Sequence, residues 1–328
     1  MELRRILITG ASGFVGRHLI DHLLATCGES VSIAAGVRSE DMPNLITAGS
    51  NAGWDGGTGS NLTIVPFDTL FADQVEAQVR RFRPTHVVHL AARSSGADSD
   101  REAIRNVNVD GTRNVLEAAA LITPFPSVLV ISTGYVYGST EPGRAAREED
   151  PIGPLWRYGP YTDSKIEMES VARNYRAFAI IVRPFSHTGP GQPPQFAVPG
   201  FARQIARIER GLDEPVITVG NLNTSRDVLD VRDIVRAYTA LLSGGKAGEV
   251  YNVATGQPVA ISDILGRMRS MSRAATEVVV DVNRFRPSEI DCSSGDPLRL
   301  WTETNWSPRI PLDTTLSDTL DYWRSQPY

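Results

Sequence analysis

The sequence predicts an α/β fold with a doubly wound parallel sheet and a smaller C-terminal lobe. Short apolar runs alternate with helix-like stretches through the first half, and a glycine-rich turn joins the first run to the first helix. Beyond residue 183 the content of proline and glycine rises. A length of 328 residues corresponds to about two domains, or to one large α/β domain carrying a lobe. Hydrophobic residues make up 41% of the chain, enough for a large core.

The first predicted unit is a strand, a turn and a helix. Residues 5–9 form a short apolar run, residues 10–16 are rich in glycine, and residues 17–25 carry apolar side chains at helical spacing. Further strand-like runs cover residues 31–37, 62–66, 86–91 and 127–132. Strands that alternate with helices indicate a parallel, doubly wound sheet.

Two stretches depart from this alternation. Residues 48–61 contain many glycines without periodicity and are predicted to form a surface loop. A phosphate-binding role for this loop is disfavoured, because it does not connect a strand to a helix. Proline-rich sequence after residue 183 predicts a domain boundary there. We expect a dinucleotide-binding domain over 1–183, with a return of about 226–253, and a substrate-binding lobe over 184–328.

Composition excludes several functional classes. The 33 basic and 38 acidic residues give a net charge of -5, and the pI of about 5.6 argues against non-specific nucleic-acid binding. Cys27 and Cys292 lie far apart, without a Cys/His cluster, so we expect neither a disulfide framework nor a metal site. The apolar run at 6–8 is too short for a signal peptide, and no window reaches the roughly 18 apolar residues of a membrane span. We therefore expect a soluble cytoplasmic protein with no membrane partner.

The glycine turn has the spacing Gly-x-x-Gly-x-x-Gly, formed by Gly10, Gly13 and Gly16. It follows a strand and precedes a helix, which is the context of the Rossmann dinucleotide site. Glycines let the backbone turn tightly and approach a pyrophosphate, whose charge meets the amides and dipole of the helix N-terminus. A purely structural turn is the competing interpretation.

The end of the second strand bears on cofactor choice. A dinucleotide site usually has Asp or Glu about 20 residues downstream of the turn, bound to the ribose 2′-hydroxyl. Here Arg38 and Ser39 occupy that region, which favours the 2′-phosphate of NADP(H) over NAD(H). NAD(H) remains possible if Arg38 is merely solvated and Glu40 or Asp41 takes the acidic role.

A second constellation consists of Tyr161 and Lys165, preceded by Ser132 and Thr133 at the end of the fifth predicted strand. A spacing of four places Tyr161 and Lys165 on one helix face. At about 5 Å and an effective dielectric of 20, their attraction is roughly 3 kcal/mol, which would lower the phenol pKa by about two units. A Tyr/Lys pair alone is mostly structural, but its combination with the glycine turn and Thr133 indicates acid/base catalysis. Ser132 is the weaker candidate.

Together these motifs resemble the extended short-chain dehydrogenases/reductases that act on nucleotide sugars, along nearly the whole chain. Motifs of the N-terminal half that support the resemblance are Leu90–Ala92, Asn108–Thr112, Val136–Gly138 and Arg183–Phe185. The C-terminal half resembles the group of GDP-mannose dehydratases and GDP-4-keto-6-deoxymannose reductases, at His187–Gln192, Val219–Leu222, Arg226–Asp227, Asp230–Asp233 and Arg286–Glu289.

Within that group the resemblance favours a reductase. Family dehydratases follow the active-site Thr with one or two acidic residues, whereas Gly134 and Tyr135 follow Thr133. The implied reaction is NAD(P)H-dependent reduction of a GDP-4-keto-6-deoxyhexose to a GDP-6-deoxyhexose of the GDP-rhamnose or GDP-6-deoxytalose type. An epimerase or 4,6-dehydratase with tightly bound nicotinamide is the alternative. A non-catalytic sensor of cofactor or nucleotide sugar is disfavoured by the complete catalytic set.

The resemblance also implies roles for individual residues. Thr133, Tyr161 and Lys165 would be catalytic. Cofactor contacts would come from Gly10, Ser12, Gly13, Phe14, Val15, Gly16, Arg38, Asp68, Leu90, Ala91, Ala92, Tyr161, Lys165 and Pro184. Substrate contacts would come from Ser94, Thr133, Tyr135, Ser186, His187, Arg226, Arg286 and Glu289.

Five of these residues have open alternatives. The family usually has Asn where this chain has Ser186, which leaves the sugar nucleotide open. His187 could equally be a structural histidine, and Tyr135 a packing residue. Arg226 and Arg286 suit a diphosphate because guanidinium groups pair bidentately with phosphate oxygens, although each could be a surface arginine.

Family members commonly form homodimers through two helices per subunit, here about 101–120 and 161–177. Apolar residues on these stretches agree with that arrangement but could instead face the sheet. They are Val115, Leu116, Ala119, Ile166, Met168 and Val171.

Overall fold

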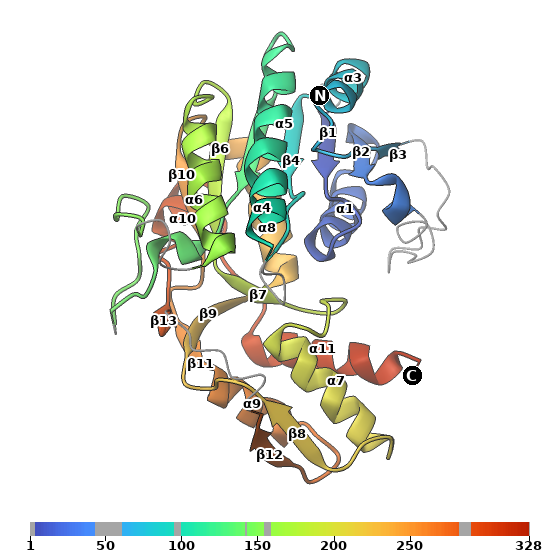
Figure 1. Cartoon of the computed structure of the whole chain (residues 1–328), viewed down its shortest axis with the longest axis vertical. Helices are drawn as coiled ribbons and strands as arrows, with labels where there is room; N and C mark the ends of the chain where they lie inside the picture. The colour runs from blue at the N-terminus through green and yellow to red at the C-terminus, as the bar shows by residue number, and fades with distance from the viewer. Residues whose placement is uncertain are drawn as a thin grey trace.

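A seven-stranded parallel sheet forms the larger part of the molecule (Figure 1). The computed structural model describes residues 4–42, 61–94, 100–141, 143–153, 159–281 and 290–327. The strand order is β10-β6-β5-β4-β1-β2-β3, so the chain winds outward in both directions from β1, as in a Rossmann fold. The predicted fold class is therefore confirmed.

The strands of this sheet are β1 (Arg4–Thr9), β2 (Val31–Val37), β3 (Leu62–Pro66), β4 (His86–His89), β5 (Ser127–Ile131), β6 (Ala179–Pro184) and β10 (Val250–Val253). All five predicted strands are present. β4 ends at His89, two residues earlier than expected, because the backbone N–H of Ala91 donates to the side chain of Thr9 on β1 instead of to a backbone carbonyl. The predicted loop at 48–61 lies, apart from Asn61, outside the described residues.

Helices cover both faces of the sheet. One face is covered by α1 (Phe14–Cys27), α8 (Val231–Gly244) and α10 (Leu298–Thr304), the other by α3 (Ala72–Phe82), α5 (Gly111–Ala120) and α6 (Pro160–Arg173). A short helix, α4 (Arg101–Arg105), continues through a π-helical turn, Asn106–Asp110, into α5 and packs on α6.

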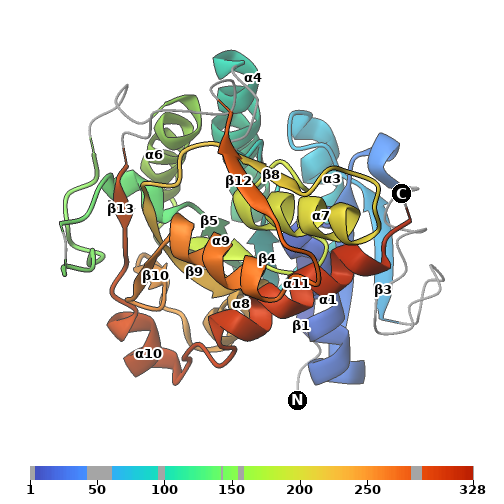
Figure 2. The same ribbon diagram turned by 90° about the horizontal axis from the view of Figure 1, so that it is seen from below.

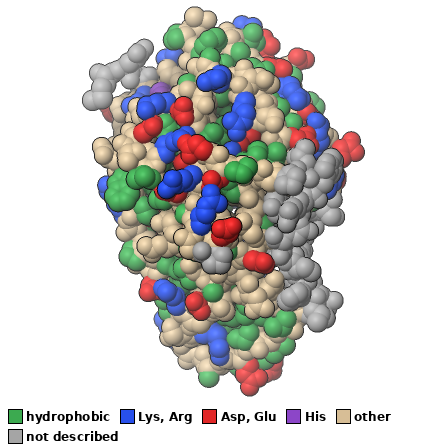
Figure 3. Space-filling view, turned by 90° about the vertical axis from the view of Figure 1, so that its left-hand side faces the viewer, with side chains coloured by type: hydrophobic (Ala, Val, Ile, Leu, Met, Phe, Trp, Pro, Cys, Tyr) green, Lys and Arg blue, Asp and Glu red, His purple; other side chains and the backbone are tan. Residues whose placement is uncertain are grey.

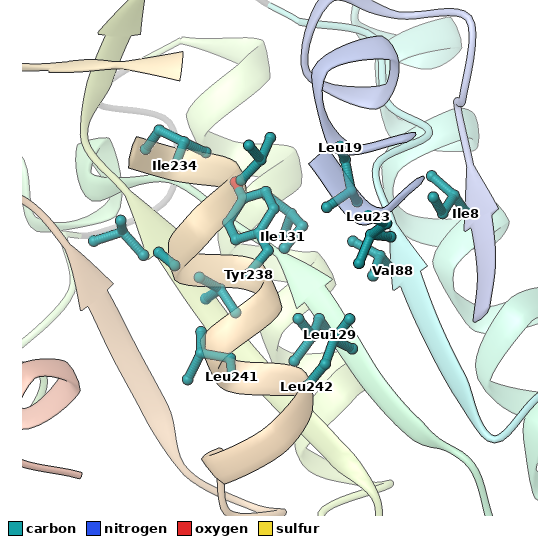
Figure 4. Packing of buried hydrophobic residues seen from close by; sticks show 14 of the residues in the cluster. Ile8, Leu19, Leu23, Val88, Leu129, Ile131, Ile234, Tyr238, Leu241 and Leu242 are labelled. Carbon is teal, nitrogen blue, oxygen red and sulfur yellow. The ribbon is translucent and has the colours of Figure 1, made fainter. Parts of the chain in front are cut away.

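Side chains of each strand alternate between two cores, as expected for a sheet buried on both sides. Ile6 and Ile8 of β1 join the core under α1 and α8, whereas Leu7 between them joins the core under α3, α5 and α6. In Figure 4, Leu19 of α1 and Tyr238 of α8 pack against side chains of the central strands.

A second group of elements lies at the carboxyl ends of these strands (Figures 1 and 2). A small sheet contains β7 (Ser186–Thr188), β9 (Ser225–Asp230), β11 (Pro258–Ala260) and β13 (Cys292–Ser293), and β8 (Val216–Val219) pairs with β12 (Glu277–Val280). Helices α7 (Ala197–Glu209), α9 (Ile261–Ser270) and α11 (Leu312–Ser325) form a third core with β8. Between β9 and β11, the chain returns to the large sheet through α8 and β10.

The apolar residues offered in support of a dimer belong to the chain's own interior. Val115, Leu116, Ala119 and Met168 lie in the core between the sheet and its helices, Val171 packs against that core, and Ile166 is buried as well. These positions therefore carry no separate evidence for a partner, because burial against the sheet already explains them.

Acidic and basic side chains are intermixed over the side of the molecule shown in Figure 3. Around α10, Arg299 pairs with Glu249 at 3.1 Å and Lys246 pairs with Glu303 at 3.1 Å. This face thus differs from the single-sign surfaces that bind nucleic acid. Among the described residues, no helix has the length and apolar character required to cross a membrane.

Candidate active site

The predicted site residues gather at one edge of the large sheet. Parallel strands all end at the same edge, and the crevice there is where ligands bind in open α/β sheets. Six strand ends carry them: Gly10 follows β1, Arg38 follows β2, Asp68 follows β3, Leu90 follows β4, Thr133 follows β5, and Pro184 ends β6.

The glycine turn forms a cradle that side chains would fill. Gly10 has φ of 66°, and a Cβ built on it would lie 2.7 Å from the backbone nitrogen of Ala91. A Cβ on Gly16 would lie 2.6 Å from the carbonyl oxygen of Gly10. The first turn of α1, which starts at Phe14, holds no acidic side chain. An anionic phosphate therefore fits the turn, since its charge would meet unshielded amides at the helix N-terminus.

Neighbouring cofactor candidates border this turn. Ser12 and Val15 are half-buried within it, and Leu90 to Ala92 run beside it, where the N–H of Leu90 donates to the Thr9 carbonyl at 3.2 Å. One Asp68 carboxylate oxygen accepts from the backbone of Leu70 at 3.0 Å. The Asp68 side chain thus caps the turn after β3, at the same edge as the glycine turn.

Arg38 is held by two carboxylates. Its Nη1 lies 2.8 Å from Glu40 and its Nη2 2.9 Å from Asp41, while its side chain stays 56% exposed. The two acids considered as ribose ligands are therefore both partners of Arg38. Exposed ion pairs of this kind are weak, so a phosphate dianion could compete for the guanidinium.

The three catalytic candidates meet at the end of β5. Thr133 is buried and caps a short 3-10 helix, Gly134–Tyr137. Its side chain forms a hydrogen bond with Tyr161, which lies in the first turn of α6. Lys165 lies one turn further along α6, with Nζ 5.8 Å from the centroid of the Tyr161 ring. The structure thus brings together three side chains from two segments of the chain.

The expected lowering of the tyrosine pKa is wrong in this structure. Burial raises the pKa of Tyr161 to about 12, Tyr135 adds to the increase, and the hydrogen bond from Thr133 opposes it. Lys165 does not lower this pKa, because its Nζ donates to the Ile131 carbonyl at 2.7 Å and so faces the strand end. Burial also lowers the pKa of Lys165 to about 8. The phenol accordingly keeps its proton at neutral pH.

Ser132, the weaker catalytic candidate, is directed away from this set. Its hydroxyl donates to the carboxylate of Glu169 at 2.6 Å, and both residues are buried. Ser132 is therefore part of an internal network rather than a second hydroxyl beside Tyr161.

Substrate candidates from both halves of the chain form a second cluster. The Tyr135 hydroxyl lies 3.3 Å from that of Ser186, and the Arg226 guanidinium carbon lies 5.7 Å from the Tyr135 ring centroid. Tyr135 also contributes to the raised pKa of Tyr161. Tyr135 consequently connects the catalytic set with Arg226, a role that exceeds the packing role considered from sequence.

His187 occupies the junction between the glycine turn and this cluster. Its ring stacks on Phe14 at 6.3 Å between centroids and 7° between planes. Its Nδ1 lies 3.0 Å from the Phe185 carbonyl, and burial lowers the pKa of the imidazole. The structure therefore gives His187 structural contacts, with the ring neutral at pH 7.

Two substrate candidates cannot be placed. Arg286 and Glu289 lie outside the described residues. Ser94 is exposed, at the end of the stretch that follows β4. Pro184 is buried at the end of β6, directly before the segment that holds Ser186.

A cavity of about 1230 Å³ opens beside Arg226 in the second group of elements. α7 lines it with Phe201, Gln204 and two arginines, and the Val219–Leu222 segment forms another wall. Three arginines and two acids line the cavity: Arg203, Arg207, Arg226, Asp213 and Glu214. Arg207 is paired with Asp213 at 2.6 Å, which leaves the lining with an excess of positive charge. Its charge and size suit an elongated anionic ligand.

The family model described as GDP-mannose 4,6 dehydratase matches residues 7–319. The chain belongs to this family. In the GDP-mannose 4,6-dehydratase family the fold is that of the extended short-chain dehydrogenases/reductases, and the resemblance inferred from the motifs is confirmed.

Several relatives of this family member have known names. GDP-6-deoxy-D-mannose reductase from Pseudomonas aeruginosa is 32% identical over 98% of each chain. UDP-glucose 4-epimerase from Mycolicibacterium smegmatis is 28% identical over 98% of this chain and 99% of that protein. Among solved structures, RMD from Pseudomonas aeruginosa complexed with NADPH has a TM-score of 0.80 and 30% identity, covering 98% of this chain and 99% of its own. The UDP-glucose 4-epimerase of Thermus thermophilus with NAD has a TM-score of 0.79 and 27% identity at the same coverage.

Sequence reasoning missed two features of this family member. The first is the α7 wall of the cavity, where Arg203 and Arg207 are four residues apart, a spacing that signals a shared helix face. The second is Glu169, which lies one helical turn after Lys165 and whose burial could not be foreseen.

Proposed function

We propose that the protein reduces the 4-keto group of a GDP-4-keto-6-deoxyhexose, with NADPH favoured and NADH as the alternative cofactor. The product is a GDP-6-deoxyhexose of the GDP-rhamnose or GDP-6-deoxytalose type. One observation carries the proposal: Thr133, Tyr161 and Lys165 come together at the end of β5, with a glycine instead of an acid immediately after Thr133.

The site's own groups supply the proton chemistry. A bound nicotinamide dinucleotide would supply hydride, and its pyrophosphate would fit the cradle at Gly10–Gly16. As negative charge develops on the sugar oxygen, Tyr161 donates its proton and Thr133 donates a hydrogen bond. The pKa of Tyr161 near 12 keeps this proton available at every physiological pH. Lys165, which donates to the Ile131 carbonyl at the end of β5, would hold the cofactor ribose.

The packing around Gly134 supports reduction over dehydration. Elimination of water from the sugar needs an acid/base group beside the active-site Thr, but a Cβ on Gly134 would lie 2.8 Å from the Phe185 ring. That ring is buried and stacks on Tyr137 at 6.2 Å between centroids, so it has little room to move. The next residue, Tyr135, is not an acid and extends to Ser186 and Arg226.

The substrate class rests on the cavity and on the relatives. Arg226 borders both the catalytic cluster and the cavity, which is where a diphosphate between sugar and nucleoside would lie. Two relatives act on GDP-6-deoxy sugars by name: the reductase above and GDP-6-deoxy-D-talose 4-dehydrogenase from Aggregatibacter actinomycetemcomitans, 27% identical over 90% of each chain. Ser186 and His187 would border the sugar, and Ser94, Arg286 and Glu289 stay candidates for further contacts.

The domain division and the dimer also remain proposals. The large sheet with α8 and β10 would bind the dinucleotide, and the remaining C-terminal elements would bind the substrate. A homodimer through α4, α5 and α6 predicts that sedimentation velocity at micromolar concentration shows about twice the chain mass of 35.7 kDa. A sedimentation mass equal to that of one chain would contradict the proposed homodimer.

Redox stoichiometry tests the reaction. Anaerobic incubation with GDP-4-keto-6-deoxymannose and NADPH should oxidise one NADPH per sugar, and NMR of the product should show a hydroxyl at C4. An epimerase or dehydratase would convert its sugar with no net consumption of NADPH, and a sensor protein would convert none. The alcohol configuration at C4 then identifies a rhamnose-type or talose-type product.

A further inference from the structure

Three side chains of α6 are tied to the end of β5. Tyr161, Lys165 and Glu169 are spaced by four and therefore share one helix face. Tyr161 bonds to the Thr133 side chain, the Nζ of Lys165 donates to a backbone carbonyl at 2.7 Å, and Glu169 accepts from a serine hydroxyl at 2.6 Å. The partners on β5 and directly after it are consecutive: Ile131, Ser132 and Thr133.

Glu169 is also half of a buried ion pair with the neighbouring strand. The side chains of Glu169 and Arg183 are 0% and 1% exposed. Arg183 donates from Nε at 2.9 Å and from Nη2 at 2.7 Å, one bond to each carboxylate oxygen. Arg173, on the outer side of α6, approaches the same carboxylate at 3.2 Å. Four hydrogen bonds thus fix one carboxylate between β5, β6 and α6, and hold it as an anion.

This anion influences the charge of Lys165. Burial lowers the pKa of Lys165, and the negative charge of Glu169 raises it again. From β4, the buried His89 faces Lys165 but is neutral, because burial lowers its pKa to about 3. The other titratable groups around this row are Tyr161 itself, Tyr135 and Tyr238 beside it, and Arg183 and Arg173 on Glu169.

We propose that Glu169 is a positioning residue for the reduction: through its bonds to Ser132 and Arg183 it fixes the end of β5, and with it Thr133 and Lys165, in register, and its negative charge lies one helical turn from Lys165. Glu169 touches neither substrate nor cofactor in this scheme and acts through its neighbours. The inference rests on the proposed function for its catalytic consequence, whereas the coupling between Glu169 and Lys165 can be measured without turnover.

The composition makes that measurement direct. Lys165 and Lys246 are the two lysines of the whole sequence, so 13C-lysine labelling yields two side-chain signals. Lys246 is 65% exposed, far from Glu169 in the sequence, and provides an internal reference. With Glu169→Gln, the Lys165 signal should titrate about one to two pH units lower than in the wild type, and the Lys246 signal should not move. Glu167→Gln is the matched control, because Glu167 lies on the same helix and pairs with Arg105 at 2.9 Å, and it should move neither signal.

Two further variants test the proposal in case Glu169→Gln does not fold. Glu169→Gln leaves the buried Arg183 guanidinium without its anionic partner. Glu169→Gln combined with Arg183→Met therefore removes both charges and should shift the Lys165 signal in the same direction. Ser132→Ala keeps the ion pair and removes one positioning bond, so it should lower kcat about 2–10-fold with the KM for NADPH unchanged.

The outcomes separate the two proposals. In the wild type and the soluble charge variants, the high-pH limb of kcat should move with the Lys165 signal. An unmoved Lys165 signal, or a Ser132→Ala variant with full kcat, would overturn the positioning role. If the Lys165 signal shifts as expected but the wild type reduces no keto sugar, the proposed function fails and the charge coupling stands.

Discussion

Replacing Tyr161 by phenylalanine removes one hydroxyl group and keeps the aromatic ring. The hydroxyl bonds to Thr133, so its loss should cost about 1 kcal/mol of folding free energy, which leaves the variant folded. The catalytic effect should be larger. General acid catalysis is typically worth about 10²–10⁴ in rate, or about 3–5.5 kcal/mol of activation free energy.

The structure indicates that the full effect should appear at neutral pH. With a pKa of about 12, essentially all Tyr161 carries its proton at pH 7, so no ionised fraction dilutes the difference between wild type and variant. Wild-type turnover should be flat at neutral pH and should fall as pH rises through about 8, where Lys165 loses the charge with which it would hold the cofactor. A rate that rises through this range would contradict the assignment.

Single-turnover oxidation of NADPH, followed by absorbance at saturating keto sugar, measures the chemical step. NADPH affinity, from quenching of protein fluorescence, should stay at the wild-type value in Tyr161→Phe. Lys165→Ala should instead weaken both turnover and cofactor binding, which distinguishes the two residues. If Tyr161→Phe retained more than about half of wild-type turnover while chemistry limits the rate, Tyr161 would not be the proton donor.

Two other substitutions test the cofactor preference and the packing next to Thr133. Arg38→Ala should raise the KM for NADPH and leave that for NADH nearly unchanged, and an equal loss for both cofactors would mean that Arg38 supports the fold through its ion pairs with two acids. Gly134→Ala should destabilise the protein by about 1–3 kcal/mol in urea unfolding, because its Cβ would press on the Phe185 ring. The control Gly266→Ala, in α9 where a Cβ meets nothing within 4 Å, should be neutral or stabilising, and equal losses at both positions would refute the steric argument.

Local spacing in the sequence determined the proposed cofactor cradle and two of the three catalytic candidates. The strand, turn and helix around Gly10–Gly16 follow one another directly, so glycine spacing and apolar periodicity suffice to predict them. Tyr161 and Lys165 share a helix face because the helical repeat is fixed. Five of the seven strands of the parallel sheet follow in the same way, from short apolar runs that alternate with helix-like stretches, whereas β10 pairs with β6 from far along the chain.

Tertiary structure decided everything that depends on burial or on partners far apart in the chain. The sequence predicts a lowered pKa for Tyr161 from a pairwise attraction, whereas the folded protein buries the phenol, turns Lys165 toward the Ile131 carbonyl and raises that pKa instead. Ser132 proved to be a partner of Glu169, because the contact of β5 with α6 sets which hydroxyl faces the site. Desolvation depends on the assembled core, so residue spacing in the sequence could not have predicted the raised pKa of Tyr161.

The candidate substrate residues show most clearly what depends on tertiary structure. Tyr135, Ser186 and Arg226 come from three segments separated by about 40 or more residues, and β7, β9 and the loop after β5 bring them together. The family resemblance indicated each of these residues separately. Only the folded structure shows that Arg226 of this cluster also borders the cavity beside α7. Local periodicity thus determined the proposed cofactor cradle, while the proposed substrate cluster was decided by long-range packing, because contacts between distant segments leave no fixed spacing in the chain.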